Sequence, residues 1–171
     1  ARTGLFMPVY HVEPAINPYE LEIRLIDSLD ADQVVVLACG DSGRIAPWGE
    51  LLSTAAMARK AAGCVTDGLV RDVRQIRRMG FPVFHGGIGP LDSKGRGRIM
   101  EIEVPVECAG VLVRPQDLVV GDADGVVVIP RDVEEAVISR AIQKVTGEND
   151  TREALLRGES LQSVFQRYGI L

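Results

Sequence analysis

Asp32-Gln-Val-Val-Val-Leu-Ala-Cys39 is a continuous run of mainly β-branched and apolar residues. Such a run is typical of a strand that is buried on both faces of a sheet. Residues 49–62, which follow after a loop, are rich in Ala, Leu, Met and Lys, and all four favour a helix. A buried strand that leads into a helix is the basic unit of α/β proteins, so this stretch predicts the fold class.

The segments on either side extend the pattern. Before residue 99, strands are predicted at 4–9, 64–66 and 82–84, and helices at 18–29 and 70–79. From residue 99 onward, strands are predicted at 99–106, 111–113, 118–120 and 125–129, and helices at 132–146, 151–157 and 161–168. Because strands alternate with helices early and cluster later, the sequence predicts an α/β fold with a mixed sheet rather than a regular doubly wound one.

No linker or internal repeat divides the sequence, which predicts a single domain over residues 1–171. The chain begins at Ala1 rather than at Met and enters its first predicted strand by Gly4. We therefore expect this domain to lack its N-terminal segment.

The composition is that of a globular protein with an acidic balance. Of the 171 residues, 46% are apolar and 25% are charged, and the net charge is −5. An acidic chain is poorly suited to broad contact with nucleic acid or an anionic membrane. No apolar run approaches the roughly 18 residues of a membrane span, and no signal peptide is visible. The expected location is the cytoplasm.

The three cysteines, Cys39, Cys64 and Cys108, are odd in number and form no CxxC pair. This spacing argues against a disulfide framework and against a structural zinc site. Each cysteine lies in or beside an apolar run, so the sequence predicts buried free thiols.

The loop Asp41–Glu50 follows the predicted strand at 32–39, at the sheet edge where α/β proteins usually bind ligands. Gly49 would let a ligand approach the backbone closely. The free amides of Glu50, Leu51 and Leu52 at the start of the helix would then face a substrate carboxylate. The alternative is a plain strand-to-helix loop in which Glu50 favours the helix start.

The stretch Asp67-Gly-Leu-Val-Arg-Asp72 also follows a strand and is expected at the same sheet edge. The guanidinium of Arg71 can form a bidentate hydrogen bond with a carboxylate or polarise a carbonyl group. Asp72 can hold a hard divalent metal whose remaining positions are filled by water. Asp67 could reach the same metal or its waters. The alternative makes Asp67 or Asp72 a helix cap and Arg71 a surface ion-pair residue.

Four motifs resemble the RraA-like family, and they occur in the family's order. They are Trp48-Gly-Glu-Leu51, Ala61-Ala-Gly-Cys-Val-Thr-Asp-Gly-Leu-Val-Arg-Asp72, Phe81-Pro-Val-Phe84 and Val119-Val-Gly-Asp-Ala-Asp-Gly-Val-Val-Val-Ile-Pro130. The family includes class II 4-hydroxy-4-methyl-2-oxoglutarate and 4-carboxy-4-hydroxy-2-oxoadipate aldolases, and the regulator of ribonuclease E activity. The resemblance implies a swivelling β/β/α domain that assembles as a homotrimer or homohexamer with sites at subunit interfaces.

The resemblance also implies the roles of individual residues. The backbone of Gly49 to Leu52 would hold the pyruvate part of the substrate, Arg71 would bind the 2-oxo acid, and Asp72 would ligate Mg²⁺ or Mn²⁺. Retro-aldol cleavage leaves pyruvate enolate, whose charge a divalent ion and Arg71 would stabilise. Oxaloacetate decarboxylation is expected as a side activity because it passes through the same enolate. The general base is not identified, and a neighbouring subunit or the missing N-terminus could supply it.

One departure from the aldolase pattern opens a second hypothesis. Aldolase members carry an acidic residue three positions after the metal-binding Asp, where this chain has Gln75. Gln75 can accept a hydrogen bond from a metal-bound water, but it brings no charge to hold the ion. The chain would then be a protein-binding regulator without catalysis, of the ribonuclease E inhibitor type.

For three other features we prefer an explanation that gives them no role in the site. His85 lies near the expected site edge, but it has no partner at metal-ligand spacing. Asp122 and Asp124 are expected in a tight turn between strands. The glycines at 86–89 with Lys94, Arg96 and Arg98 are expected to form a mobile basic loop, with phosphate binding as the alternative.

Overall fold

The computed structural model describes residues 1–40 and 42–170. The chain divides into two compact units, Ala1–Pro130 and the residues from Arg131 onward. The expectation of one domain over residues 1–171 stays a prediction, and each unit is described here by itself.

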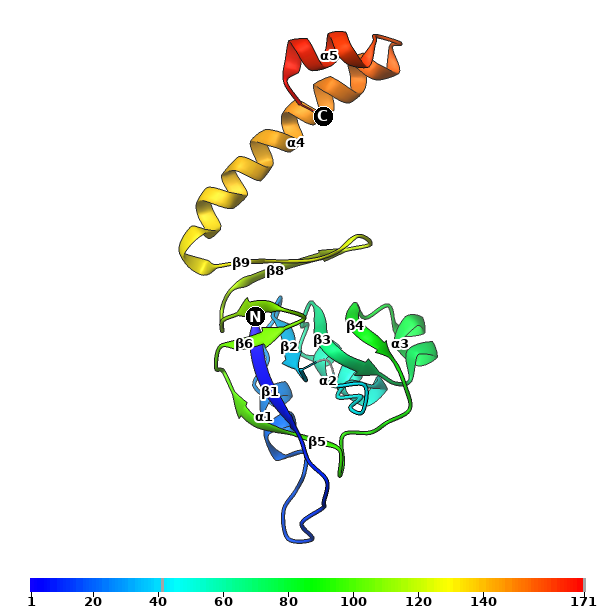
Figure 1. Ribbon diagram of the computed structural model, residues 1–171, viewed down its shortest axis with the longest axis vertical. Coiled ribbons are helices and arrows are strands. Elements are labelled where there is room, and N and C mark those ends of the chain that lie inside the picture. Colours follow the sequence, from blue (N-terminus) through cyan, green and yellow to red (C-terminus); the bar gives the residue numbers. More distant parts are fainter. Residues whose placement is uncertain (41, 171) are drawn as a thin grey trace. The chain divides into compact units, whose positions relative to one another are not determined.

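The first unit is built on a five-stranded sheet with the order β4-β3-β2-β1-β5 (Figure 1). Its central strands are parallel: β1 pairs with β2, β2 with β3, and β3 with β4. The edge strand β5 runs antiparallel to β1, so the predicted mixed sheet is confirmed. The bounds are β1 Arg2–Pro8, β2 Val34–Ala38, β3 Gly63–Val70, β4 Val83–Ile88 and β5 Gly97–Ile102.

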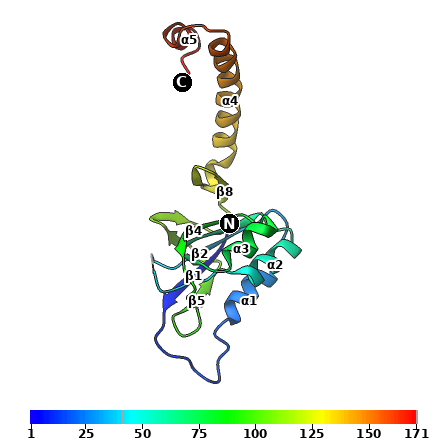
Figure 2. The ribbon, with the colours of Figure 1, turned by 90° about the vertical axis from the view of Figure 1, so that its right-hand side faces the viewer.

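Three helices, α1 (Glu20–Asp27), α2 (Glu50–Ala58) and α3 (Val73–Met79), cover one face of this sheet (Figure 2). The main core lies beneath them, where alternate strand residues such as Val35, Leu37 and Cys64 are buried. Trp48 is fully buried in this core, stacks on Phe81 with ring centroids 6.0 Å apart, and donates its indole N–H to Ser53 Oγ at 2.8 Å. This packing fixes the start of α2.

The opposite face of the sheet carries a smaller core, in which Val36 and Ala38 pack with Val106, Cys108 and Val113. These last three residues come from the hairpin of β6 (Val106–Cys108) and β7 (Val111–Val113). A second hairpin, β8 (Leu118–Asp122) and β9 (Gly125–Ile129), follows. All three cysteines are buried and free, which confirms the prediction for the thiols.

The helix predicted over 70–79 begins three residues later than expected, because β3 continues to Val70. Leu69 and Val70 still pair with Gly87 and Ile88 of β4, so they belong to the sheet. The cost of leaving those backbone groups unpaired favours the longer strand. As a consequence, Arg71 and Asp72 form the connection between β3 and α3, and Asp72 adopts a left-handed conformation with φ +59°.

The second unit contains a 3₁₀ turn at Arg131–Val133, the long helix α4 (Glu134–Leu156) and the short helix α5 (Leu161–Tyr168). The predicted break between residues 146 and 151 is wrong, because α4 runs through it. Packing against α5 overrides the weak helix propensity of the residues between them. Thr151, Ala154 and Val164 are buried where the two helices meet. Among the helices described, none is both long enough and apolar enough to span a membrane.

Gly86 of β4 gives a test of the sheet. A Cβ atom at this position would lie 2.2 Å from the carbonyl oxygen of Asp67, so Gly86→Ala forces two strands apart. We expect the free energy of unfolding to fall by about 1–3 kcal/mol, measured by urea denaturation. Gly43→Ala is the control, because nothing lies within 4 Å of its added Cβ. Equal stability of the two variants would contradict this packing.

Candidate functional site

The two segments that the sequence predicts to bind a ligand, the loop before α2 and the turn between β3 and α3, meet at one edge of the sheet. Trp48 forms a parallel bridge with Val70, and the backbone N–H of Arg71 donates to Trp48 O at 3.0 Å. The N–H of Glu50, the first residue of α2, donates to Asp72 Oδ2 at 3.1 Å. The structure therefore places Gly49, Glu50, Arg71 and Asp72 side by side. Asp41, at the start of the first loop, lies outside the described residues.

A glycine is needed at position 49 because a side chain there would collide with the neighbouring turn. Its φ of −152° is open to any residue, but a Cβ atom would lie 2.7 Å from Asp72 Oδ2 and 3.1 Å from Cγ of Arg71. A side chain at position 49 would therefore push Arg71 and Asp72 away from the start of α2. In the structure, the β3–α3 turn approaches Gly49 closely, at the position where the sequence predicts the approach of a ligand.

Glu50, Leu51 and Leu52 are the first three residues of α2, so no intrahelical acceptor exists for their amides. The Glu50 amide is taken by Asp72, whose carboxylate sits at the positive end of the helix. Leu51 is 75% exposed, whereas Leu52 packs against the main core. The amides that follow Glu50 are the ones with capacity to receive a substrate carboxylate.

Arg71 lies between two carboxylates. Its Nη1 is 3.3 Å from Asp72 Oδ2, and its Nη2 is 3.3 Å from Asp92 Oδ1. Tyr19 donates its hydroxyl to the other oxygen of Asp92 at 2.6 Å. Sequence reasoning missed Asp92 and Tyr19. Asp92 could have been found, because it follows β4, and the carboxyl ends of neighbouring parallel strands share one sheet edge.

The residues present suit a hydrated divalent ion at Asp72. This side chain is 35% exposed, and its described hydrogen bonds use Oδ2, which leaves Oδ1 to act as a ligand. A cleft of about 480 Å³ adjoins it, and the lining residues are Arg71, Asp72, Val73, Ile88, Gly89, Pro90 and Asp92. In the part of the chain that the structure describes, no three His, Cys, Asp or Glu residues gather as a metal cage. A single carboxylate with a water-filled shell is a known way to hold Mg²⁺.

Asp67 is occupied elsewhere. Its carboxylate accepts hydrogen bonds from the backbone amides of Cys39 at 2.5 Å, Gly40 at 3.2 Å and Ala109 at 3.4 Å. The side chain is 8% exposed and ties β3 to the end of β2 and to the β6–β7 turn. We therefore assign Asp67 a structural role, in place of the predicted shared contact with the metal or its waters.

Two groups near Asp92, the buried Glu22 and the partly buried Tyr19, have shifted pKa values. Burial raises the pKa of Glu22 to about 8, and the nearby Asp92 carboxylate adds to this effect while Arg71 opposes it. Burial also raises the pKa of Tyr19 to about 12, and its hydrogen bond to Asp92 contributes. Near neutral pH, Glu22 is therefore mostly uncharged and Tyr19 keeps the proton that it donates.

The remaining sequence candidates lie outside this cleft. Gln75 is exposed in the first turn of α3, and its backbone N–H donates to Asp72 O at 2.9 Å. His85 lines a separate apolar cavity of about 430 Å³ under the hairpins. The turn between β8 and β9 is closed as expected, by the Asp124 amide on Asp122 Oδ1.

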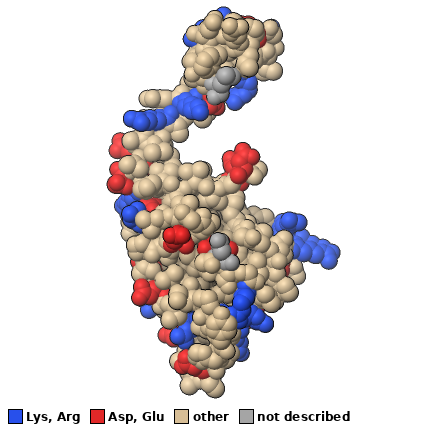
Figure 3. Space-filling view, viewed as in Figure 1, with Lys and Arg blue, Asp and Glu red and all other residues tan. Residues whose placement is uncertain are grey.

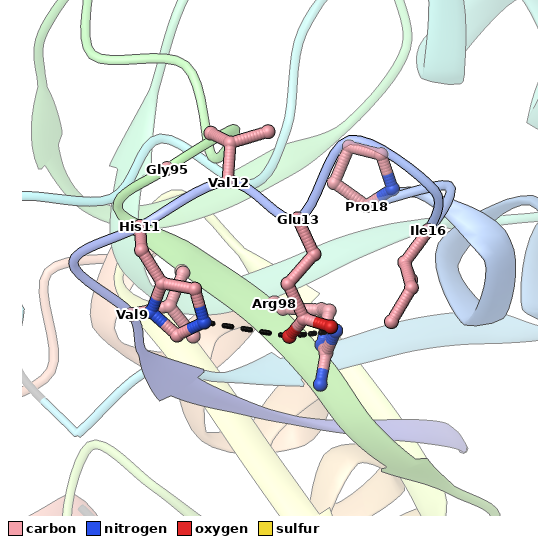
Figure 4. Close-up of a pocket in the computed structure, with 9 residues that line it drawn as sticks. Val9, His11, Val12, Glu13, Ile16, Pro18, Gly95 and Arg98 are labelled. Atoms are coloured by element: carbon pink, nitrogen blue, oxygen red, sulfur yellow. Dashed lines mark hydrogen bonds and ion pairs between the residues drawn. The ribbon is translucent and has the colours of Figure 1, made fainter.

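The basic loop takes part in local contacts. Arg96 donates to the carbonyl oxygen of Asp92 at 3.1 Å, and Arg98 lies 4.0 Å from Glu13. Figure 4 shows this Glu13 carboxylate between Arg98 and His11, in a pocket of only about 40 Å³. That space suits a water molecule rather than a substrate. On the face shown in Figure 3, acidic and basic side chains are interspersed rather than gathered in one basic stripe.

The sequence matches known proteins over most of the first unit. The model of the RraA-like family, described as Aldolase/RraA, matches residues 11–128, more than half of the chain. A Halalkalibacterium halodurans protein named "Putative 4-hydroxy-4-methyl-2-oxoglutarate aldolase" is 40% identical over 129 residues, 75% of this chain and 60% of that protein. The 4-hydroxy-4-methyl-2-oxoglutarate aldolase of Thermus thermophilus is 30% identical over 107 residues, 63% and 65% of the two chains. The chain thus spans less than two thirds of each relative.

Solved structures share the fold. A crystal structure of an uncharacterized protein from Pseudomonas syringae pv. tomato gives a TM-score of 0.84 at 26% identity, over 95% of this chain and 74% of that one. Streptomyces coelicolor RraAS2, described as an unusual member of the RNase ES inhibitor RraA protein family, gives 0.77 at 28% identity, over 88% and 73%. These matches confirm the predicted resemblance and the RraA-like α/β fold.

The acidity of Glu22 predicts how stability depends on pH. Its pKa is raised from 4.5 to about 8 on folding, so its contribution to stability is complete below pH 4.5 and is lost as the pH rises toward 8. The loss is roughly 1.4 kcal/mol per pH unit within that window. In Glu22→Gln this part of the pH dependence disappears, as measured by urea denaturation from pH 5 to 9. Glu20→Gln, at an exposed position of the same helix, should keep the wild-type profile; an unchanged profile in Glu22→Gln would refute the assignment.

Proposed function

The chain belongs to the RraA-like family, and we propose that it is a divalent-metal-dependent lyase that cleaves a 4-hydroxy-2-oxo dicarboxylic acid to release pyruvate. The observation that carries this proposal is the contact of Arg71 and Asp72 with the start of α2. It puts a cation, a metal-competent carboxylate and free helix amides at one cleft. The names of the Halalkalibacterium and Thermus relatives support the same reaction class.

In the proposed complex, the substrate carboxylate lies against the amides after Glu50, where the helix dipole favours negative charge. Arg71 donates from its guanidinium to the 2-oxo group or to the adjacent carboxylate. Two of its donors are already used by Asp72 and Asp92, which leaves further N–H groups for the substrate. Arg71 therefore binds and orients the 2-oxo acid.

Cleavage of the carbon–carbon bond leaves negative charge on the former 2-oxo oxygen of pyruvate enolate. Mg²⁺ or Mn²⁺ held by Asp72 would supply Lewis-acid stabilisation of that charge. Arg71 stabilises the same oxygen with a positive charge that is already in place before the reaction. Because decarboxylation of oxaloacetate leaves the same enolate, we propose it as a side activity.

A non-catalytic regulator is the second candidate. Gln75 favours it, since this exposed amide brings no charge toward a metal held by Asp72. The Streptomyces structure is described as a member of an RNase inhibitor family. The same fold can therefore serve functions other than cleavage of a carbon–carbon bond. Assembly as a homotrimer or homohexamer, with sites completed at subunit interfaces, remains part of the proposal for either function.

Pyruvate release tests the lyase directly. We expect turnover of 4-hydroxy-4-methyl-2-oxoglutarate or oxaloacetate with Mg²⁺ or Mn²⁺, loss of turnover in EDTA, and a fall of at least about a hundredfold in Asp72→Ala and Arg71→Ala. Asp30→Ala is the matched control. Asp30 is exposed and does not line the cleft, so this variant should keep full activity. A folded wild type that turns over neither substrate with either metal would rule out this lyase and favour the regulator.

Gln75→Glu tests how the metal is held. A carboxylate here would accept hydrogen bonds from metal-bound water with a full negative charge. We expect the Mg²⁺ dissociation constant to fall by about tenfold, measured by calorimetry on the protein without substrate. Gln143→Glu, on the exposed part of α4, should leave it unchanged. Equal affinity in both variants would show that Gln75 does not face the ion's water shell.

A further inference from the structure

We infer that Asp92 and Tyr19 are positioning residues. They hold the guanidinium of Arg71 at the cleft while it donates hydrogen bonds to Asp72 and to the substrate. The inference deepens the proposed function and rests on it for the identity of the anion. Neither residue was expected from the sequence motifs. Both are argued here from the hydrogen bonds that converge on Arg71.

Arg71 depends on its two carboxylate neighbours for its orientation. Its Nε is buried and has no hydrogen-bond partner among the described residues. The planar group is therefore held at its two ends, by Asp72 on Nη1 and by Asp92 on Nη2. A divalent ion at Asp72 would compete with Arg71 for that carboxylate. Asp92 is then the remaining anchor, so the direction of the guanidinium rests on it.

Asp92 is itself fixed from several sides. Tyr19 donates to its Oδ2 at 2.6 Å, and the Lys94 amide lies 3.4 Å from the same oxygen. Its carbonyl oxygen accepts from Arg96, and its backbone forms a parallel bridge with Ala46 in the loop before α2. Because Tyr19 immediately precedes α1, the contact links that helix to the cleft. The anchor is thus set by the fold before any ligand binds.

The positioning role and a simple charge effect predict opposite results. Asp92 adds negative charge beside an anion site, so on charge alone its removal should strengthen binding of a 2-oxo acid. If Asp92 positions Arg71, its removal should weaken binding, because the guanidinium loses its anchor. Asp92→Asn separates the two, since it removes the charge and keeps the shape of the side chain.

The experiment uses pyruvate as the probe, titrated by calorimetry into the full chain with Mg²⁺. We expect Asp92→Asn to raise the dissociation constant about tenfold and Tyr19→Phe to raise it a few-fold. The double variant should bind as weakly as Asp92→Asn alone, because Tyr19 acts through Asp92. Asp27→Asn is the matched control, since Asp27 pairs with Arg59 away from the cleft and should leave binding unchanged.

Wild-type or tighter binding by a folded Asp92→Asn would overturn the inference, as would strictly additive effects of the two changes. In turnover assays the same variants should raise KM more than they lower kcat, which a loss of general stability would not produce. Pyruvate binding without turnover would refute the lyase but leave this test intact. Turnover that is indifferent to Asp92→Asn would refute the inference but leave the lyase standing. A wild type that binds no pyruvate would overturn both.

Discussion

The site depends on the close approach of the β3–α3 turn to the start of α2, which only a glycine at position 49 allows. There the Glu50 amide meets Asp72 Oδ2 at 3.1 Å, in the space where a Cβ atom would otherwise lie. The contact satisfies one of the free amides of the helix and places a carboxylate at its positive end. Arg71 and Asp72 have their positions at the cleft because of this approach.

The fold supplies the approach from both sides. The buried Trp48, stacked on Phe81 and bonded to Ser53, fixes where α2 begins. The extension of β3 to Val70 fixes where the turn begins. Asp67, buried and bonded to three backbone amides, secures the middle of the same strand. The cleft thus rests on buried and hydrogen-bonded segments, which suits the precise placement of groups that binding and catalysis require.

Much of this could be predicted from the sequence, where local patterns carry the information. The run at 32–39 gave a buried strand, and the loops ending at Gly49 and Asp72 were expected at one sheet edge. The end of β3 was missed because Leu69 and Val70 are held by pairing with β4, a contact that no local pattern encodes. The continuity of α4 through residues 146–151 was missed for a similar reason, since α5 stabilises it from outside the segment.

The partners of Arg71 were the least predictable part of the site. Asp92 follows β4 and could have been expected at this sheet edge, but Tyr19 lies before α1, and only the folded chain brings it to Asp92. In the proposed lyase, Asp72 holds a divalent ion beside Arg71. The most direct measurement is Mn²⁺ binding by electron paramagnetic resonance, for the wild type and Asp72→Asn, with and without pyruvate. We expect the wild type to bind Mn²⁺, pyruvate to tighten that binding, and Asp72→Asn to lose it. Mn²⁺ binding that is the same in Asp72→Asn would contradict the claim.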